Sequence, residues 1–319
     1  MLFDQIPLQR IQQYKYRFFL LIAVVFVFTF LIGGRGLVLP SLQDSSHALV
    51  FGLATNLLLL VLIPDKPISN LQRAKYVLAI CLASFLFGIF IELIQPLFGR
   101  DRSLLDASYD LAGATVAGLL YWRKHTEHAN TKPALLLIIW IQLLSCLAIP
   151  ASNTLVVFQR YLASPMLVSF DSSWERNIRS INDGTHFSIT PPPKDWKQEG
   201  LVGKFEFGHA TYPGISFPYI YSDWSGYSKL SFSVFSEQDQ ELELYLRVND
   251  IQHDNKYSDR FNQRLSIKSG LNVIDLDLNK IKHSPKSREM DLSHIASLAL
   301  FMARQKERKT LYIDNIQLR

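Results

Sequence analysis

The chain has very little cysteine. Its 319 residues include two, Cys81 and Cys146, and both lie within apolar segments. The polar C-terminal half has none, which excludes a disulfide framework there. Motifs for several reaction classes are also lacking, because the sequence has no nucleophile elbow, no phosphate-binding glycine-rich loop, no HExxH and no Cys-x-x-Cys. The sequence therefore names no reaction, and it leaves open whether the protein is an enzyme.

The C-terminal half also lacks an excess of charge. Residues 165–319 contain 20 basic and 20 acidic residues, so the net charge of +5 belongs to the N-terminal half. There the basic residues fall in loops between apolar runs, an arrangement typical of loops beside a membrane. We therefore expect no nucleic-acid partner.

Long apolar runs fill the N-terminal half. A helix needs roughly 20 apolar residues to cross a bilayer, and backbone polar groups within lipid must be satisfied inside the helix. Five segments qualify or nearly qualify as transmembrane helices: 17–38, 47–63, 76–97, 106–122 and 134–157. The first run has no small-residue cleavage site near its end, so we expect it to be retained as a span.

Basic residues in alternate loops predict the orientation of these helices. The N-terminus and the loops after the second and fourth spans hold nine of them, against three in the other loops. The nine are Arg10, Lys15, Arg17, Lys66, Arg73, Lys75, Arg123, Lys124 and Lys132. The N-terminus is therefore expected in the cytoplasm and, with five spans, the C-terminal half outside it.

Polar residues gather at one end of the second, third and fourth spans. Asp106, Asp110 and Gly113 form one helical stripe, and its small residue allows close helix approach. Ionisable side chains at the edge of a membrane are costly and indicate a role. The candidates for this outward-facing cluster are His47, Glu92, Gln95, Arg100, Arg102, Asp106 and Asp110.

Four short patterns occur in a fixed order: Asp44-Ser-Ser-His47, Glu92-Leu-Ile-Gln95, Arg100 or Arg102, and Asp106-Ala-Ser-Tyr-Asp110-Leu-Ala-Gly113. Over about residues 15–125 they resemble the VanZ-like family of bacterial membrane proteins, which is named for a glycopeptide resistance protein. The resemblance implies an inner-membrane protein with a role in the cell envelope. Asp110 departs from the pattern, because many members carry Asn there, and it adds a charge to the cluster.

Three interpretations of the cluster stay open. It could be a hydrogen-bonded and ionic network that holds three helices together. It could bind or act on an envelope lipid or a lipid-linked glycan, with arginines on a phosphate and His47, Glu92 or Asp106 as acid and base. The third interpretation is a Mg²⁺ or Mn²⁺ site formed by carboxylates and imidazole.

Period-two alternation dominates the C-terminal half. Leu230–Phe235, Leu242–Val248 and Leu271–Leu278 alternate apolar and polar residues, and Ile295–Met302 and Thr310–Leu318 are also typical of strands. The predicted fold class is therefore an α-helical transmembrane bundle of about five spans followed by an all-β antiparallel jelly-roll sandwich.

Several segments of this half, among them Asp223-Trp-Ser-Gly-Tyr227 and Leu311-Tyr-Ile-Asp-Asn-Ile316, resemble galactose-binding-like carbohydrate-binding modules. Aromatic rings stack on sugars while Arg and Asp bond hydroxyls. The sugar-binding candidates are Trp196, Trp224, Tyr227, Arg247, Asp250, Tyr257 and Arg260. An alternative is that Trp224 and Tyr227 pack the fold and that Arg247 pairs with Asp250. The resemblance also implies a structural Ca²⁺ held by Asp314 with residues near Asp171.

These patterns predict five segments. They are a cytoplasmic N-terminus (1–16), a VanZ-like membrane domain of four helices (17–125), a fifth transmembrane helix (134–158), a linker (159–169) and the β-sandwich (170–319). The predicted function is an inner-membrane envelope protein whose cluster engages a membrane lipid or lipid-linked glycan and whose outer domain binds a polysaccharide or peptidoglycan. The alternative is a non-enzymatic scaffold or sensor with a purely structural cluster.

Overall fold

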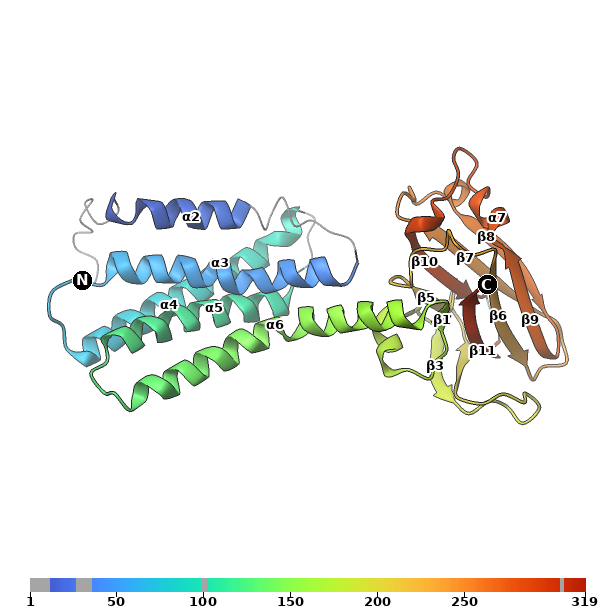
Figure 1. The fold of residues 1–319 in the computed structure, drawn as a ribbon, viewed down its shortest axis with the longest axis horizontal. Coiled ribbons are helices and arrows are strands. Elements are labelled where there is room, and N and C mark those ends of the chain that lie inside the picture. The colour runs from blue at the N-terminus through green and yellow to red at the C-terminus, as the bar shows by residue number, and fades with distance from the viewer. Residues whose placement is uncertain (1–11, 27–35, 99–101, 305–306) are drawn as a thin grey trace. The chain divides into compact units, whose positions relative to one another are not determined.

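The computed structural model describes residues 12–26, 36–98, 102–304 and 307–319. The chain divides into two compact units, residues 1–154 and 155–319, and the boundary falls within one long helix. Helices form the first unit and mainly strands form the second (Figure 1). The predicted helical N-terminal part and antiparallel β-sheet domain are both confirmed.

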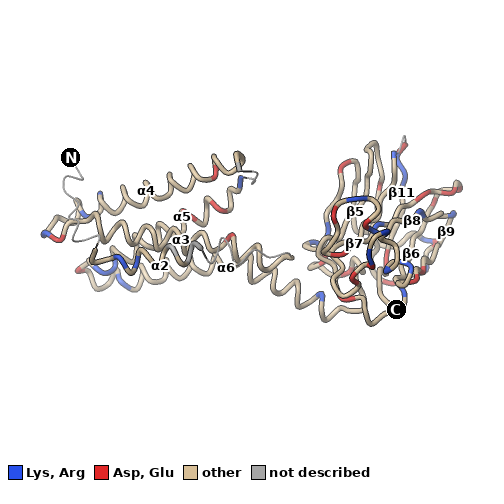
Figure 2. The backbone as a smooth tube through the Cα atoms, turned by 90° about the horizontal axis from the view of Figure 1, so that it is seen from above, with Lys and Arg blue, Asp and Glu red and all other residues tan. Residues whose placement is uncertain are grey.

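The helices of the first unit are α2 (Lys15–Phe26), α3 (Val38–Leu62), α4 (Asn70–Ile94), the 3₁₀ turn η2 (Gln95–Phe98), α5 (Leu104–His125) and the start of α6 (Thr131–Ala163). Among the described residues, three helices are long and apolar enough to cross a membrane: Val38–Leu62, Asn70–Leu97 and Thr131–Ala163. Charged residues are sparse along α4 and α6 (Figure 2). The number of spans remains a prediction.

Helix α3 begins nine residues earlier than the span predicted at 47–63, so His47 lies inside the helix and does not open it. Pro40 fits the first turn because the amide it lacks would have no partner there. The hydroxyls of Ser41 and Ser46 donate to the carbonyls of Val38 and Gln43, which accommodates polar side chains in the helix. The first predicted span, 17–38, includes residues 27–35, which lie outside the described part of the chain.

Small residues let α3 and α5 approach closely. A side chain at Gly113 would collide with the carbonyl oxygen of Ala48 and come within 2.8 Å of the amide nitrogen of Gly52. Further along the same helices, Leu59, Ile80 and Ala117 form a buried apolar core with α4. Gly113, the small residue of the stripe predicted on α5, therefore packs directly against α3.

The segment predicted as a linker, 159–169, is ordered within the second unit. Helix α6 continues to Ala163, and strand β1 (Met166–Val168) pairs with β11. The guanidinium of Arg160 donates to the carbonyls of Tyr219 and Ile220 at 2.5 and 3.2 Å, and these bonds fix the last turn of the helix. The β-sandwich therefore begins before residue 170.

Two antiparallel sheets make up the sandwich. One has the order β3-β4-β11-β6-β9 with β1 on β11, and the other has the order β2-β5-β10-β7-β8. The strands of the first sheet are β3 (Thr185–Thr190), β4 (Val202–Phe207), β6 (Lys229–Ser236), β9 (Gly270–Asp277) and β11 (Lys309–Leu318). Those of the second are β2 (Ser180–Ile181), β5 (Gly214–Phe217), β7 (Leu242–Asp250), β8 (Phe261–Ile267) and β10 (Ile295–Phe301).

Alternate residues of both sheets form the core of the sandwich. Phe205, Phe207, Phe217 and Phe232 are almost completely buried. On β7 the residues Leu242, Leu244, Leu246 and Val248 point inward, so the side chains between them are left on the outer face of the sheet. This alternation positions the candidate site.

Candidate functional site

A cleft of about 580 Å³ lies on the second sheet of the sandwich. Aromatic, arginine and amide side chains line it together with small residues. The lining residues are Asn182, Tyr212, Ser216, Tyr245, Leu246, Arg247, Tyr257, Arg260, Asn262, Ala299, Phe301 and Ala303. A hollow of this size with a few polar groups among apolar surface is typical of a small-ligand site.

Strand register places the main side chains of the cleft in neighbouring rows. Tyr245 of β7 lies opposite Phe301 of β10, and Arg247 lies opposite Ala299 of β10 and Asn262 of β8. Because Tyr245 and Arg247 are two residues apart, they project from the same face. Ala299 is small, so it leaves space in the cleft beside the Arg247 side chain.

Three aromatic rings form a platform in the cleft. The Phe301 and Tyr245 rings stack with centroids 5.6 Å apart, and the Tyr212 ring meets Phe301 edge-on at 5.8 Å. Gly214, opposite Phe301 in β5, leaves space for that ring, since a β-carbon there would lie 2.5 Å from the Phe301 β-carbon. Such a platform can cover the apolar face of a ring-shaped ligand.

Hydrogen-bond donors lie beside this platform. Arg247 and Arg260 contribute guanidinium groups, and the Arg260 guanidinium lies over the Tyr257 ring at 5.4 Å. The Asn262 side chain donates to the carbonyls of Tyr257 and Arg260, which ties the loop before β8 to the strand. Stacking rings next to fixed donors can bind a polyhydroxylated ligand.

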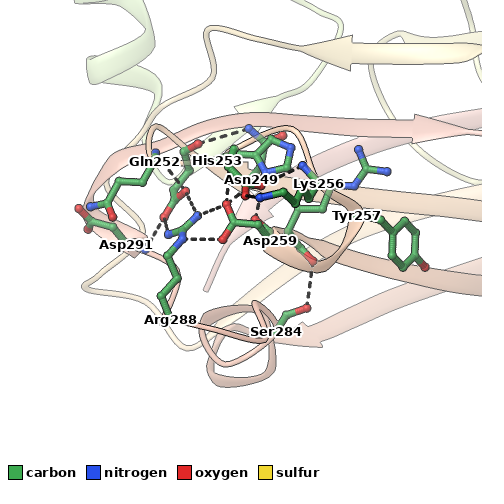
Figure 3. A network of polar contacts seen from close by, with 12 residues as sticks. Asn249, Gln252, His253, Lys256, Tyr257, Asp259, Ser284, Arg288 and Asp291 are labelled. Carbon is green, nitrogen blue, oxygen red and sulfur yellow. Dashed lines mark hydrogen bonds and ion pairs between the residues drawn. The ribbon is translucent and has the colours of Figure 1, made fainter.

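A network of ion pairs holds the loop that carries Tyr257 and Arg260 (Figure 3). Arg288 donates two hydrogen bonds to Asp250 at 2.5 and 2.8 Å and two to Asp259 at 2.6 and 2.9 Å. These bonds hold the pKa of Asp259 well below its usual range and raise that of Arg288. Burial alone would raise the pKa of Asp250, but hydrogen bonds from Arg288 and the Asp291 amide lower it on balance. The Arg288 guanidinium therefore connects its own loop with the end of β7 at Asp250 and with the loop that carries Asp259.

His253, Asp254 and Asp259 have potential metal-ligand atoms within 4.8 Å of one another. Both carboxylate oxygens of Asp259 already accept hydrogen bonds from Arg288. The Asp254 carboxylate binds the ammonium group of Lys256 at 2.6 Å. The carboxylate oxygens that could bind a metal already accept hydrogen bonds from the protein, so this group does not fit a metal site.

The structure brings three of the seven predicted sugar-binding residues into the cleft: Arg247, Tyr257 and Arg260. A fourth, Asp250, pairs with Arg288, so the suggested pairing of Asp250 with Arg247 was wrong. Asp250 therefore supports the cleft from its loop network and does not line it.

The remaining three candidates do not line the cleft. Trp196 stacks on Phe235 in the core, and the Tyr227 hydroxyl bonds Ser164. Trp224 is fully buried, and its indole Nε1 donates to the Tyr221 carbonyl. The two tryptophan rings lie away from the cleft because they are buried in the core, whereas Tyr227 is half-buried and contacts Ser164.

Sequence reasoning missed most of the lining side chains, among them Asn182, Tyr212, Tyr245, Asn262 and Phe301. One signal for them was present. Tyr245 and Arg247 occupy outward positions of the alternating segment Leu242–Val248, so the period-two pattern already placed both side chains on the outer face of a strand. An aromatic ring and a guanidinium on one face are side chains that can contact a sugar.

The polar cluster predicted in the N-terminal half joins three helices. His47 Nδ1 of α3 lies 3.0 Å from Asp110 Oδ1 of α5, and Gly88 of α4 leaves space for the Asp110 side chain. Glu92 of α4 accepts a hydrogen bond from the Ser103 amide at 2.8 Å. Asp106 and Gln95 are also buried, whereas Arg102 is exposed and Arg100 lies outside the described residues.

A second cavity, of about 430 Å³, adjoins this cluster between α4 and α5. Apolar side chains such as Phe85, Ile89 and Leu111 line most of it. Glu92, Arg102 and Ser103 contribute polar groups where α4 ends and α5 begins. The cavity therefore combines an apolar wall with a charged end.

The predicted calcium residues lie at one region of the sandwich. Asp314 is 1% exposed, and its Oδ1 atom has no hydrogen-bond partner. Burial raises its pKa to about 7, with a further contribution from Asp171. Gln198 donates to Asp314 and the Leu201 amide donates to Asp171, so one loop connects the two carboxylates. A buried carboxylate oxygen without a hydrogen-bond partner, near a second carboxylate, could supply part of the oxygen ligands that Ca²⁺ needs.

Comparisons with known proteins describe the sandwich alone. No protein-family model and no curated protein matches the chain. A Clostridium thermocellum family 11 carbohydrate-binding module in complex with a β-1,3-1,4-mixed-linked tetrasaccharide is 20% identical, with a TM-score of 0.37 over 48% of this chain and 94% of that chain. A non-crystalline cellulose-specific module, CBM28, is 12% identical, with a TM-score of 0.35 over 49% and 92% of the two chains. An exo-β-agarase is 19% identical, with a TM-score of 0.40; the match covers 49% of this chain and only 25% of that enzyme.

Proposed function

We propose that this protein binds a polysaccharide through the cleft on its β-sandwich. The observation that carries the proposal is the platform of Tyr212, Phe301 and Tyr245 beside the guanidinium groups of Arg247 and Arg260. Aromatic rings cover the apolar faces of sugar rings, and arginine and asparagine side chains bond the hydroxyl groups around them.

Isothermal titration of the purified full-length chain with a panel of oligosaccharides tests the proposal. The panel contains fragments of mixed-linkage β-glucan, xylan, agarose, pectin and peptidoglycan. At least one should bind, and Tyr257→Ala should weaken that binding. The matched control is Leu271→Ala, which removes an exposed side chain from the other sheet. Absence of binding to every saccharide at millimolar concentration would rule the proposal out.

The helical unit anchors this binding domain in the inner membrane of a bacterium, in the manner of VanZ-like proteins. Three apolar helices and the unequal distribution of basic residues between alternate loops support the anchor. In this arrangement the N-terminus is cytoplasmic and the sandwich is extracytoplasmic. The protein then has a role in the cell envelope.

Cysteine labelling tests the orientation, because the sandwich contains no native cysteine. Glu199→Cys places an exposed thiol on the sandwich, and Lys66→Cys places one between α3 and α4. In intact spheroplasts a membrane-impermeant maleimide should label the first and spare the second. The reverse pattern contradicts the orientation, and labelling of both only after lysis contradicts an extracytoplasmic sandwich.

The polar cluster engages an envelope lipid or a lipid-linked glycan. The cavity between α4 and α5 supports this part of the proposal, since its apolar wall suits an acyl chain and Arg102 suits a phosphate. Native mass spectrometry of the protein extracted from membranes should find a lipid bound. Arg102→Gln should lose that lipid without changing the amount of protein.

The second candidate function is a non-enzymatic scaffold or sensor in which the cluster holds the helices together. The direct contact of His47 with Asp110 and the fit of Asp110 against Gly88 favour it. Glu92→Gln and Asp106→Asn separate the two candidates. Loss of bound lipid at unchanged protein abundance supports a lipid site, whereas loss of folded protein from the membrane supports a structural cluster.

A further inference from the structure

Two arginines line the cleft, and neither guanidinium is fully hydrogen-bonded. Arg247 projects from β7, and Arg260 directly precedes β8. The Nε atom of each is buried without a hydrogen-bond partner. Within the described part of the chain, neither guanidinium forms an ion pair. Arg288 in the same unit differs, because it binds two carboxylates with four hydrogen bonds.

Holding these two charges together is unfavourable in the absence of an anion. Burial lowers the pKa of Arg247, and repulsion from the Arg260 guanidinium lowers it further. Arginine nevertheless keeps its proton at neutral pH, so the positive charge stays in the cleft. A bound anion would accept hydrogen bonds from both guanidinium groups in place of the water they have lost. Its negative charge would also reduce the repulsion between them.

The arginines also adjoin the surface on which a sugar would stack. Tyr245 and Arg247 are successive outward residues of one strand, which places them about 7 Å apart along it. A ligand that stacks on Tyr245 and Phe301 therefore brings its neighbouring unit to the arginines. Carboxylate and sulfate groups match the planar fork of a guanidinium, since both accept paired hydrogen bonds.

We propose that the cleft selects a polysaccharide carrying negatively charged groups, carboxylate or sulfate, and that Arg247 and Arg260 together bind one such group. This inference rests on the proposed saccharide-binding function and goes beyond it by naming the class of ligand.

Titration of the full-length chain with matched ligand pairs tests the inference. One pair is an oligogalacturonate and its uncharged methyl ester, and the other is a sulfated galactan oligosaccharide and its desulfated form. The charged member of at least one pair should bind about tenfold more tightly or better. Its affinity should fall as sodium chloride is raised, whereas the affinity of the neutral member should change little. The pair that shows the preference distinguishes carboxylate from sulfate.

Variants connect the preference to the two arginines. Arg247→Gln and Arg260→Gln should each reduce the affinity for the charged ligand about tenfold and leave the neutral ligand within about twofold. The matched control is Arg308→Gln, which removes an exposed arginine beside Glu206 of the other sheet, and it should preserve the preference. If Arg247→Gln does not fold, Arg260→Gln and the salt dependence of the wild type decide the question.

The outcomes separate this inference from the function on which it rests. Equal affinity for charged and neutral ligands would overturn the selection of anions and leave saccharide binding intact. An equal loss of both affinities in the arginine variants would also overturn it, because the arginines would then bond hydroxyl groups. Failure of every ligand to bind would overturn the saccharide-binding function itself.

Discussion

Tyr245 and Phe301 lie opposite each other on β7 and β10, with their ring planes inclined by 18°. The Tyr245 hydroxyl donates to Glu243 at 3.0 Å, and the Phe301 ring is also met edge-on by Tyr212. The two rings are therefore held in place before any ligand arrives. A preformed stacking surface loses little side-chain freedom on binding, which favours affinity.

Removal of one ring from this pair is expected to weaken saccharide binding. Phe301→Ala deletes a stacking surface and the support of Tyr245, and the affinity should fall about three- to tenfold in isothermal titration. Leu271→Ala, which removes an exposed side chain from the other sheet, serves as the matched control with nearly wild-type affinity. Unchanged binding by Phe301→Ala, with its fold verified by circular dichroism, would show that the platform is not the binding surface.

The Arg288 network should stabilise the sandwich in a pH-dependent manner. Arg288→Gln removes the guanidinium that binds both buried carboxylates, Asp250 and Asp259, and about 3 kcal/mol of the free energy of unfolding should be lost at pH 7. The pKa values of both carboxyls are lowered in the folded protein. Their contribution is therefore present above about pH 4 and is lost as the pH falls below it.

Chemical denaturation of both proteins at pH 7 and at pH 3 measures this effect. The difference between wild type and Arg288→Gln should narrow at the lower pH. Arg264→Gln is the control, because Arg264 and Glu243 form an exposed pair worth about 0–1 kcal/mol. A variant that is as stable as the wild type at pH 7 would contradict the role given to Arg288.

Hydropathy and period-two alternation were sufficient to predict helices followed by an antiparallel sandwich. They did not predict the start of α3, because the polar residues before His47 are typical of a loop. In the structure the Ser41 and Ser46 hydroxyls donate to carbonyls of the preceding turn, and these residues are helical. Helical spacing placed Asp110 and Gly113 on one face, but it could not show that His47 Nδ1 lies 3.0 Å from Asp110 Oδ1, because that contact joins two helices. The helices and strands could be predicted mainly because each depends on the local periodicity of apolar and polar residues.

The cleft depends on relationships that no local pattern contains. Phe301 and Tyr245 become neighbours only through the pairing of β10 with β7, and Tyr212 joins them from the segment before β5. Trp196 and Trp224 attracted attention because tryptophan often binds sugars, yet the core takes both rings. Long-range strand order decided which aromatic residues reached the surface.

The buried Asp314 carboxyl should make the stability of the folded protein depend on pH and on calcium. Its pKa is raised to about 7 by burial, so the folded protein binds a proton that the unfolded chain releases near pH 4. Without a cation, stability should therefore decrease as the pH rises from about 4 through about 7. Asp314→Asn removes this dependence because the amide carries no charge.

Thermal melting of the full-length chain in EDTA and in CaCl₂ at pH 7.5 examines both parts of this prediction. Calcium should raise the melting temperature of the wild type by binding Asp314 and Asp171 in the folded state. Asp314→Asn should melt higher than the wild type in EDTA and gain little from calcium. An equal calcium shift in both proteins would place the ion elsewhere, and no shift in either would remove the calcium site.

Gly113 should be among the least replaceable residues of the helical unit. A β-carbon there meets the Ala48 carbonyl and the Gly52 amide, which are backbone atoms of α3 that cannot rotate away. Gly113→Val should therefore push α3 away from α5 and disturb the His47–Asp110 contact. The free energy of unfolding should fall by about 1–3 kcal/mol. Ser108→Val adds a branched side chain at an exposed position of the same helix and controls for the change in helix propensity. Melting of both variants in detergent, followed by the helical signal in circular dichroism, compares them. Equal melting temperatures would mean that α3 and α5 do not pack through Gly113.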